Sequence, residues 1–348
     1  MDYTYSNFNN LTSLWEKLDN LDNKYNYKEQ IYALYGIYSN AWKKLRYQGG
    51  LRFEQVYTDS KVKQNDIKFN RNYTSLYPSL HFQYELSKER EIQLSYSRRV
   101  ERPSPREMNP YVDYSDSLNI RKGNPDLKPE YSNSLELGFM KYWPKSSLSS
   151  TAFYRQTSDN VEDITRLDAN GISTEMPQNI NKSESYCFEF VASLNPYKWM
   201  RINSNLSFYR SVVSAIVEEN IPGADRFSYS ARVNANLNYS KDGSVQLIAN
   251  YMSPHNTIQE KEEGSFTMDV SLRQDLFKNK VSLTIRATDI FNTRNHNSTI
   301  TGSNFTSVNK RRMESLVLYA GFQFRINNYS KKTEKDPSNG NQENMDEF

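Results

Sequence analysis

The stretch Glu314–Asn327, "ESLVLYAGFQFRIN", alternates apolar and more polar residues over most of its length. The apolar set occupies every second position: Leu316, Leu318, Ala320, Phe322, Phe324 and Ile326. Because successive side chains of a β-strand point to opposite faces, this pattern predicts a strand with one apolar face. The fold depends on what covers that face, a protein core or the hydrocarbon of a membrane.

The composition of the chain is unusual for a soluble domain. Only 36% of its 348 residues are hydrophobic and the mean hydropathy is −0.85, yet aromatic residues reach 14%, with 26 Tyr and 17 Phe. A soluble core uses more aliphatic residues, and a disordered chain has fewer aromatic ones. The 44 basic and 41 acidic residues give no concentrated basic face, so nucleic acid is not an expected partner.

Alternation predicts about thirteen strands. Their approximate ranges are 30–40, 45–57, 76–87, 90–101, 131–142, 147–157, 184–195, 199–213, 227–240, 244–253, 265–276, 280–291 and 315–326. Many reach ten residues or more, whereas strands of globular sheets usually have about five or six. A tilted strand needs roughly 9–11 residues to cross a bilayer, and no apolar run approaches the roughly 20 residues of a membrane helix.

The predicted connections alternate between short and long. Short turns fall at 39–44, 87–90, 143–146, 195–198, 241–244 and 277–280, and long polar segments at 58–75, 103–130, 158–183, 214–226, 254–264 and 292–314. All long connections then emerge on one side, as in outer-membrane barrels. No amphipathic helix is predicted to cover the apolar strand faces, so the bilayer is the expected partner layer. The pattern predicts an all-β, transmembrane, antiparallel up-and-down β-barrel.

Arg98–Phe139 contains three motifs: Arg102-Pro103, Asn109-Pro110-Tyr111, and Gly123-Asn124-Pro125-Asp126-Leu127-Lys128-Pro129-Glu130. This segment resembles the signature of the TonB-dependent receptors of the outer-membrane β-barrel family, especially the Bacteroidota type. The segments 26–40, 49–54 and 287–294 are also similar to that family. We take as the candidate extracellular loop motif Arg102, Pro103, Asn109, Pro110, Tyr111, Gly123, Asn124, Pro125, Leu127, Pro129 and Glu130.

The resemblance implies a receptor of the bacterial outer membrane that binds and imports an iron chelate, vitamin, glycan or peptide. It also implies a 22-stranded barrel, a plug domain and TonB as partners in a full-length protein, so we expect this chain to be the C-terminal part of the barrel. Outer-membrane proteins end in a strand that the barrel-assembly machinery recognises. Tyr319, Gly321, Phe324 and Ile326 match the form of that signal.

We expect three regions: an N-terminal loop or partial strand at 1–28, barrel strands at 29–326, and a polar disordered tail at 327–348. Residues 2–9 are a candidate fourteenth strand. The start of the chain lacks the basic and apolar regions of a cleavable signal peptide. Two other hypotheses stay open: a free-standing small barrel that acts as a passive pore, and a soluble all-β binding protein.

Residues 103–130 allow several interpretations. Their carboxylates lack EF-hand spacing, so a solvated loop is favoured over a calcium site. Their prolines stiffen the loop with or without contact to a ligand. Four arginines, Arg98, Arg99, Arg102 and Arg106, either meet an anionic ligand or lipid headgroups, or form ion pairs with acids in the lumen, the interpretation that we favour.

The sequence gives no support for catalysis or a cofactor. His81, His255 and His296 are scattered without metal-ligand spacing, and no nucleophile, zinc or nucleotide motif occurs. The single Cys187 excludes an intramolecular disulfide and is expected to face the lumen. The basic segment 309–314 is expected to be a solvated rim before the last strand.

Overall fold

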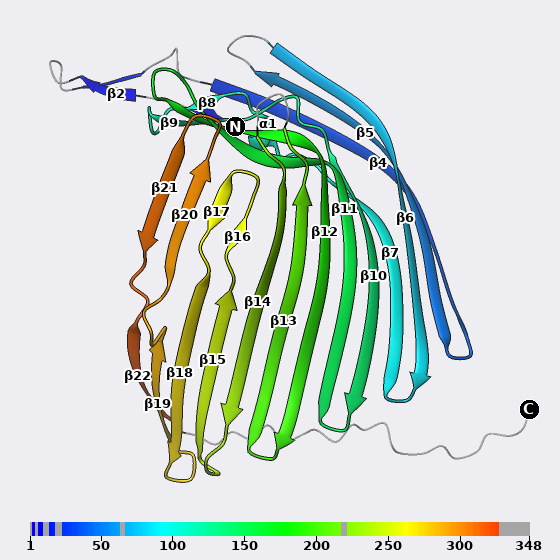
Figure 1. Cartoon of the computed structure of the whole chain (residues 1–348), viewed down its shortest axis with the longest axis vertical. Coiled ribbons are helices and arrows are strands. Elements are labelled where there is room, and N and C mark those ends of the chain that lie inside the picture. The colour runs from blue at the N-terminus through cyan, green and yellow to red at the C-terminus, as the bar shows by residue number, and fades with distance from the viewer. Residues whose placement is uncertain are drawn as a thin grey trace, which may run out of the picture.

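The computed structural model describes residues 2–3, 6–9, 14–17, 23–62, 67–216 and 221–326. Thirteen long strands follow one another in a single curved sheet (Figure 1). They are β4 (Asn23–Trp42), β5 (Leu45–Val62), β6 (Ile67–Ser87), β7 (Arg90–Glu101), β10 (Glu130–Trp143), β11 (Ser146–Leu167), β12 (Ser173–Tyr197), β13 (Met200–Val213), β14 (Ala224–Leu237), β15 (Gly243–Met252), β18 (Ser265–Leu276), β19 (Val281–Thr288) and β22 (Val317–Phe324). Each pairs antiparallel with the next, which confirms the predicted up-and-down order.

The described sheet is open. Its long strands begin with β4, which also pairs with a two-residue strand at its start, and end with β22; no ladder joins β4 and β22 among the described residues. The candidate fourteenth strand at 2–9 does not form as one strand: β1 (Asp2–Tyr3) pairs with the start of β4, whereas β2 (Ser6–Asn9) pairs with β3 (Leu14–Lys17). β4 begins at Asn23, before residue 29, and the predicted tail at 327–348 lies outside the described residues.

The short turns lie together at one end of the sheet and the long connections at the other, as predicted (Figure 1). Two segments expected as long loops, 58–75 and 158–183, are instead mostly strand. In the first, β5 extends to Val62 and β6 begins at Ile67; in the second, β11 extends to Leu167 and β12 begins at Ser173. These extensions have polar side chains on both faces, so their alternation is lost although the backbone ladder continues.

The remaining long connections carry small elements of their own. α1 (Pro105–Met108), β8 (Val112–Asp113) and β9 (Asn119–Lys122) lie between β7 and β10. A separate four-stranded sheet joins β16 (His255–Asn256), β17 (Glu260–Glu262), β20 (Asn295–Thr301) and β21 (Thr306–Arg312). The basic segment predicted as a rim loop is therefore largely the end of strand β21. In the part of the chain that the structure describes, no helix has the length and apolarity that crossing a membrane would require.

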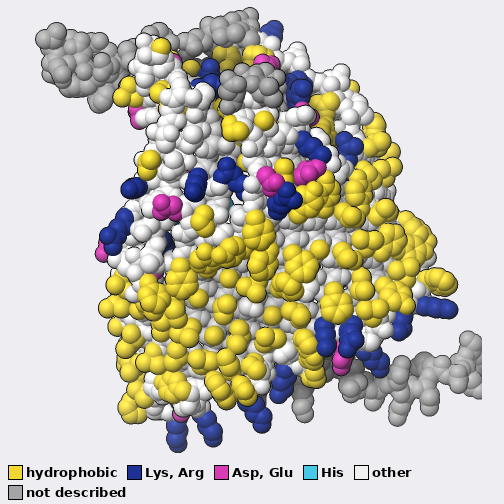
Figure 2. Space-filling view, viewed as in Figure 1, with side chains coloured by type: hydrophobic (Ala, Val, Ile, Leu, Met, Phe, Trp, Pro, Cys, Tyr) yellow, Lys and Arg dark blue, Asp and Glu magenta, His cyan; other side chains and the backbone are white. Residues whose placement is uncertain are grey.

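The outer face of the sheet carries a continuous apolar band. Leu94, Leu137, Phe188 and Phe208 lie in one cross-strand row and are all exposed. Figure 2 shows this band over the half of the sheet nearest the short turns, with charged side chains above and below it. The face of the opening stretch belongs to the same band, since Leu318 is 76% exposed and Phe322 68%. Such a surface is stable against lipid rather than water.

Aromatic side chains line both margins of the band. The upper margin has Tyr186, Phe227 and Tyr229, and the margin near the short turns has Trp42, Trp143, Tyr197, Trp199, Tyr239 and Phe277, all of them exposed. Aromatic rings with one apolar and one wet side favour the boundary between hydrocarbon and headgroups. The two rows therefore define which part of each strand crosses the membrane.

The opposite face of the sheet is polar and internally hydrogen-bonded. Asn205 Nδ2 donates to Glu189 Oε1 at 2.9 Å, and Gln246 Nε2 donates to Asn234 Oδ1 at 3.2 Å. Cys187 lies between the exposed Tyr186 and Phe188, so its thiol belongs to this inner face. This wet face explains the low hydrophobic content, because the protein needs only one apolar surface.

The outer band gives a direct prediction for Leu137. Replacing Leu137 by Arg should lower the free energy of unfolding by about 2 kcal/mol, because a cation would face hydrocarbon between the two aromatic rows. Denaturant titration of the protein isolated from outer membranes, in lipid vesicles, measures this. The matched Glu136→Arg variant faces the polar interior and should change the free energy much less; equal losses would contradict the assigned faces.

Candidate ligand-binding site in the long connections

The connection between β7 and β10 begins with a capped turn of helix. Glu107 N donates to Ser104 Oγ at 3.3 Å, and Ser104 N donates to Glu107 Oε2 at 2.7 Å, which is a capping box. Pro105 occupies the first turn, where a missing backbone N–H costs nothing, and Pro110 follows the helix end at Asn109. Pro105 and Pro110 therefore set the limits of α1, and of these two only Pro110 belongs to the predicted motif.

Two of the sequence motifs pack against each other. Gly123 N donates to Asn109 O at 2.9 Å, and Asn124 N donates to Glu107 O at 2.6 Å. A Cβ atom at Gly123 would lie 2.4 Å from Asn109 O and 2.5 Å from Glu107 O, so only glycine permits this approach. The structure thus brings the Asn-Pro-Tyr and Gly-Asn-Pro motifs together.

The end of the connection docks onto the β11–β12 hairpin. Asn124 Nδ2 donates to Pro177 O at 3.1 Å, and the Leu127 side chain is fully buried. Lys128 N donates to Asn179 Oδ1 at 2.8 Å, while Asn179 Nδ2 donates to Lys128 O at 3.0 Å. This two-way amide contact fixes the chain just before Pro129 and Glu130, where β10 starts.

Arg102 joins this connection to three distant strands. The ladder between β6 and β7 ends at Ser79 and Ser97, so the upper part of β6 has no backbone bond to β7. Across this split Arg102 Nε donates to Tyr73 Oη at 3.0 Å and lies 3.8 Å from Glu29 Oε1, while Arg102 Nη2 pairs with Glu54. Among the alternatives for the arginines, Arg102 therefore forms ion pairs with acids of the wall.

Burial affects the carboxylates of this region in different ways. Burial alone would raise the pKa of Glu54, but hydrogen bonds from Arg52 and Arg102 outweigh it and hold the pKa below its ordinary value. A lowered pKa means that the ion pair stabilises the fold above the usual titration range of Glu and that this stabilisation is lost as pH falls. Burial raises the pKa of Glu130, although the Val161 N–H opposes the shift.

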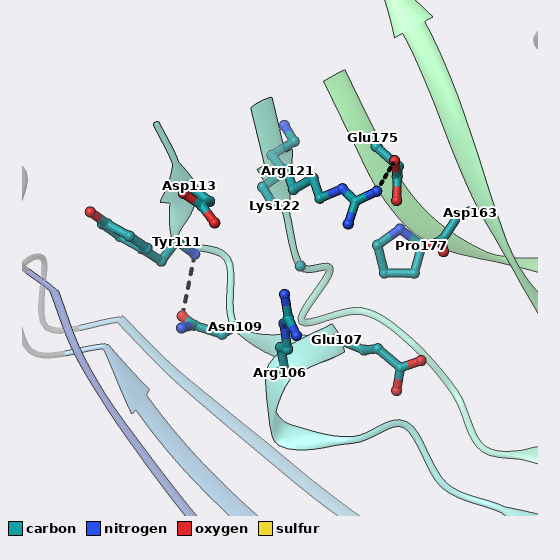
Figure 3. Close-up of a pocket in the computed structure, with 11 residues that line it drawn as sticks. Arg106, Glu107, Asn109, Tyr111, Asp113, Arg121, Lys122, Asp163, Glu175 and Pro177 are labelled. Atoms are coloured by element: carbon teal, nitrogen blue, oxygen red, sulfur yellow. Dashed lines mark hydrogen bonds and ion pairs between the residues drawn. The ribbon is translucent and has the colours of Figure 1, made fainter. Parts of the chain in front are cut away.

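A cavity of about 270 Å³ lies between the connection and the β11–β12 hairpin (Figure 3). Its lining residues are Arg106, Glu107, Asn109, Tyr111, Asp113, Arg121, Lys122, Gly123, Asp163, Glu175 and Pro177. Arg121 Nη2 pairs with Glu175 Oε2 at 3.0 Å. Arg106 projects from α1 into the space below Arg121 and Lys122, and neither Arg106 nor Lys122 has an ion pair among the described residues.

The cavity suits noncovalent binding of a ligand with polar and charged groups. It combines Asn109, Tyr111 and Gly123 of the predicted motif with residues of β9, β11 and β12, whose proximity no sequence pattern indicates. Arg102, Leu127 and Glu130 lie outside its lining and have structural contacts instead. Among the described residues, no three His, Cys, Asp or Glu side chains are grouped so as to hold a metal ion.

The sequence reasoning missed Asp289, which lies where β19 leaves the wall. Its side chain is fully buried and accepts hydrogen bonds from Arg294 N at 2.9 Å, Thr293 N at 3.0 Å and Ser315 Oγ at 2.5 Å. Burial would raise the pKa of Asp289, but these bonds together hold it below its ordinary value. The carboxylate ties the start of β20 to the chain between β21 and β22. The sequence does contain a signal for this role: Asp289 directly follows the strand β19 and comes three residues before Asn292-Thr293, a pattern typical of a carboxylate that caps a turn.

The fold, the lipid-facing band and the long connections on one side define an outer-membrane β-barrel wall. The model of the outer membrane protein beta-barrel family matches residues 1–324, and the chain belongs to this family, which places it in the bacterial outer membrane. No curated protein matches the sequence. The Bacteroidota type indicated by the motifs stays a prediction.

Solved structures share the fold at low sequence identity. The copper transporter OprC has a TM-score of 0.63 and 14% identity, covering 85% of this chain and 46% of its own. The ferric yersiniabactin uptake receptor FyuA from Yersinia pestis has a TM-score of 0.58 and 15% identity, covering 86% and 46%. The ferric-catecholate import receptor Fiu from E. coli K12 has a TM-score of 0.58 and 12% identity, covering 78% and 42%. The chain thus spans less than half the length of these three proteins.

Arg102 is predicted to hold the connection against the wall. Arg102→Ala should cost about 2 kcal/mol, because it leaves the buried Glu54 with one partner fewer. Limited proteolysis of intact cells should then cut residues 103–129 faster. Arg99→Ala is the control, since Arg99 has no ion pair among the described residues. Equal cleavage rates in the two variants would contradict the role of Arg102.

Asp289→Asn should destabilise the protein by about 2–3 kcal/mol, because an amide cannot accept from all of the surrounding donors. The loss should be largest near neutral pH and shrink in acid, since the lowered pKa of Asp289 stabilises the fold only while the group is charged. Denaturant midpoints measured over a pH series test this. Asp242→Asn, on a short turn, serves as the control. If the stability difference between wild type and Asp289→Asn did not change with pH, the charge of Asp289 would not be the source of the stabilisation.

Proposed function

We propose that this chain is the C-terminal barrel portion of a TonB-dependent outer-membrane receptor that binds a nutrient at the cell surface and imports it. The observation that carries the proposal is the β7–β10 connection, whose family-like motifs fold into one wall of a charged cavity on the side of the long connections. The open sheet supports a larger barrel over a free-standing pore, because an unpaired strand edge in lipid leaves backbone groups unsatisfied.

The structure of the cavity suggests how the chain contributes to capture. Arg106 and Lys122 have no ion pair among the described residues, so their charges are available to acceptor groups of a ligand. Asp163 adds a carboxylate acceptor to the lining, whereas Glu175 is paired with Arg121. An iron chelate, a vitamin, a glycan or a peptide remains compatible with this mixture. In the complete receptor, a plug domain and TonB provide the energised step, and the barrel-assembly machinery inserts the wall through Tyr319, Gly321, Phe324 and Ile326.

The neighbours in fold are consistent with this proposal. The proteins named above are a copper transporter, a ferric-catecholate import receptor and a ferric yersiniabactin uptake receptor, so barrels of a related fold serve uptake in those proteins. Metal chelates are therefore the first substrates to test, with vitamins, oligosaccharides and peptides beside them.

The test is uptake by source cells that carry the complete receptor as wild type or as the Arg106→Gln/Lys122→Gln variant. We expect saturable uptake of one radiolabelled substrate class that stops when a protonophore removes the inner-membrane potential. The variant should need about 100-fold more substrate for half-maximal uptake, since each of the two lost charge-assisted hydrogen bonds contributes about 1.5 kcal/mol or more. Lys145→Gln, on a short turn at the other end, is the matched control.

Two outcomes would overturn the proposal. Uptake that continues unchanged with the protonophore, and without substrate preference, would show a passive pore. If the variant reached half-maximal uptake at the same substrate concentration as wild type, the cavity would have no role in ligand binding.

A further inference from the structure

The strand β21 ends in three consecutive cations, Lys310, Arg311 and Arg312, and all its residues are exposed. His296 lies opposite Arg311, and Asn297 opposite Lys310, so the paired strand β20 offers these cations no carboxylate. None of the three forms an ion pair with any residue that the structure describes. Glu263, which follows β17, accepts instead from Asn297 Nδ2 at 2.8 Å. We call Lys310, Arg311 and Arg312 the basic end of β21.

The basic end of β21 is held just above the membrane-facing band. Arg312 and Leu316 are four residues apart, which is at most about 13 Å of chain, and Leu316 is exposed at the top of the apolar face of β22. The Asp289 carboxylate fixes this height, because it binds Ser315 and the start of β20 together. Figure 2 shows Lys and Arg side chains over β20 and β21 directly above the apolar band.

Two cations at this margin on other strands, Arg210 and Lys182, are neutralised within the protein. Arg210 donates to both oxygens of Asp225, at 2.8 and 2.5 Å, and Lys182 lies 2.5 Å from Glu184. The basic end of β21 lacks such partners, although it lies at the margin where headgroups begin. Its charges are therefore available for an anion that comes from outside the protein.

We propose that the basic end of β21 binds the phosphate groups of outer-leaflet lipid. Arginine matches phosphate with two parallel hydrogen bonds, and the flexible Lys and Arg stems let the charged groups reach down to headgroup depth. The exposed ring of Phe291 packs against the exposed Phe266, with 5.8 Å between the ring centroids, and suits the acyl boundary below the phosphates. The site would anchor the long connections at a fixed height above the bilayer.

The test uses the complete protein purified from outer membranes in detergent. Its probes are lipid A, phosphatidylcholine and inorganic phosphate, each titrated while native mass spectrometry follows bound lipid and a thermal melt follows stability. We expect lipid A to bind and to raise the melting temperature, with weaker effects of phosphatidylcholine and none of inorganic phosphate. Near an anionic surface each cation contributes about fivefold in affinity, so Lys310→Gln/Arg311→Gln/Arg312→Gln should weaken lipid A binding by about 100-fold.

Two variants control for folding and position. The charge-keeping Arg311→Lys/Arg312→Lys variant should retain most of the binding, and Lys198→Gln/Arg201→Gln, near the short turns, should match wild type. The heat-dependent shift of unboiled samples on gels verifies that each variant is folded. Unchanged lipid A binding by the glutamine variant would overturn the proposal, and equal protection by inorganic phosphate would show a site for soluble anions instead. Neither result bears on nutrient uptake, so this proposal can fail independently of the proposed function.

Discussion

Backbone hydrogen bonding in hydrocarbon is the constraint on which this structure depends. A bilayer offers no partner for an unpaired N–H or C=O, so a chain without long apolar helices crosses it only as strands that bond to both neighbours. That requirement explains the strictly sequential antiparallel order, since short turns place each new strand beside the last. The same requirement leaves the identity of the side chains largely open, because the outer face only has to be apolar and the inner face only has to be compatible with water.

The strands that cross the membrane could be predicted because the bilayer imposes alternation on them. Leu137 and Leu318 face lipid as the period-2 pattern indicates. Beyond the aromatic margin water surrounds both faces and the pattern disappears, so the sequence predicts a loop where β11 and β12 continue as strands. Local pattern therefore predicts the membrane-spanning wall well and predicts the emergent part poorly.

The candidate site was predictable only in part, for a related reason. Motif residues such as Gly123 and Asn109 could be recognised, but their contact depends on how the connection folds back on itself. The partners of Arg102 lie on β4, β5 and β6, and nothing in the local sequence indicates the split that brings them within reach. Long-range ion pairs carry no periodic signal, so they become visible only in three dimensions.

The spacing of the two aromatic margins has a consequence for the surrounding membrane. On β12 there are eleven steps from Tyr186 at the upper margin to Tyr197 at the lower one, which is about 37 Å of strand. With the usual tilt of 35–45° this corresponds to an apolar height of about 28 Å, close to the roughly 30 Å of an average hydrocarbon core. The lipids next to this wall therefore need little thinning or stretching, and the cost of hydrophobic mismatch is small.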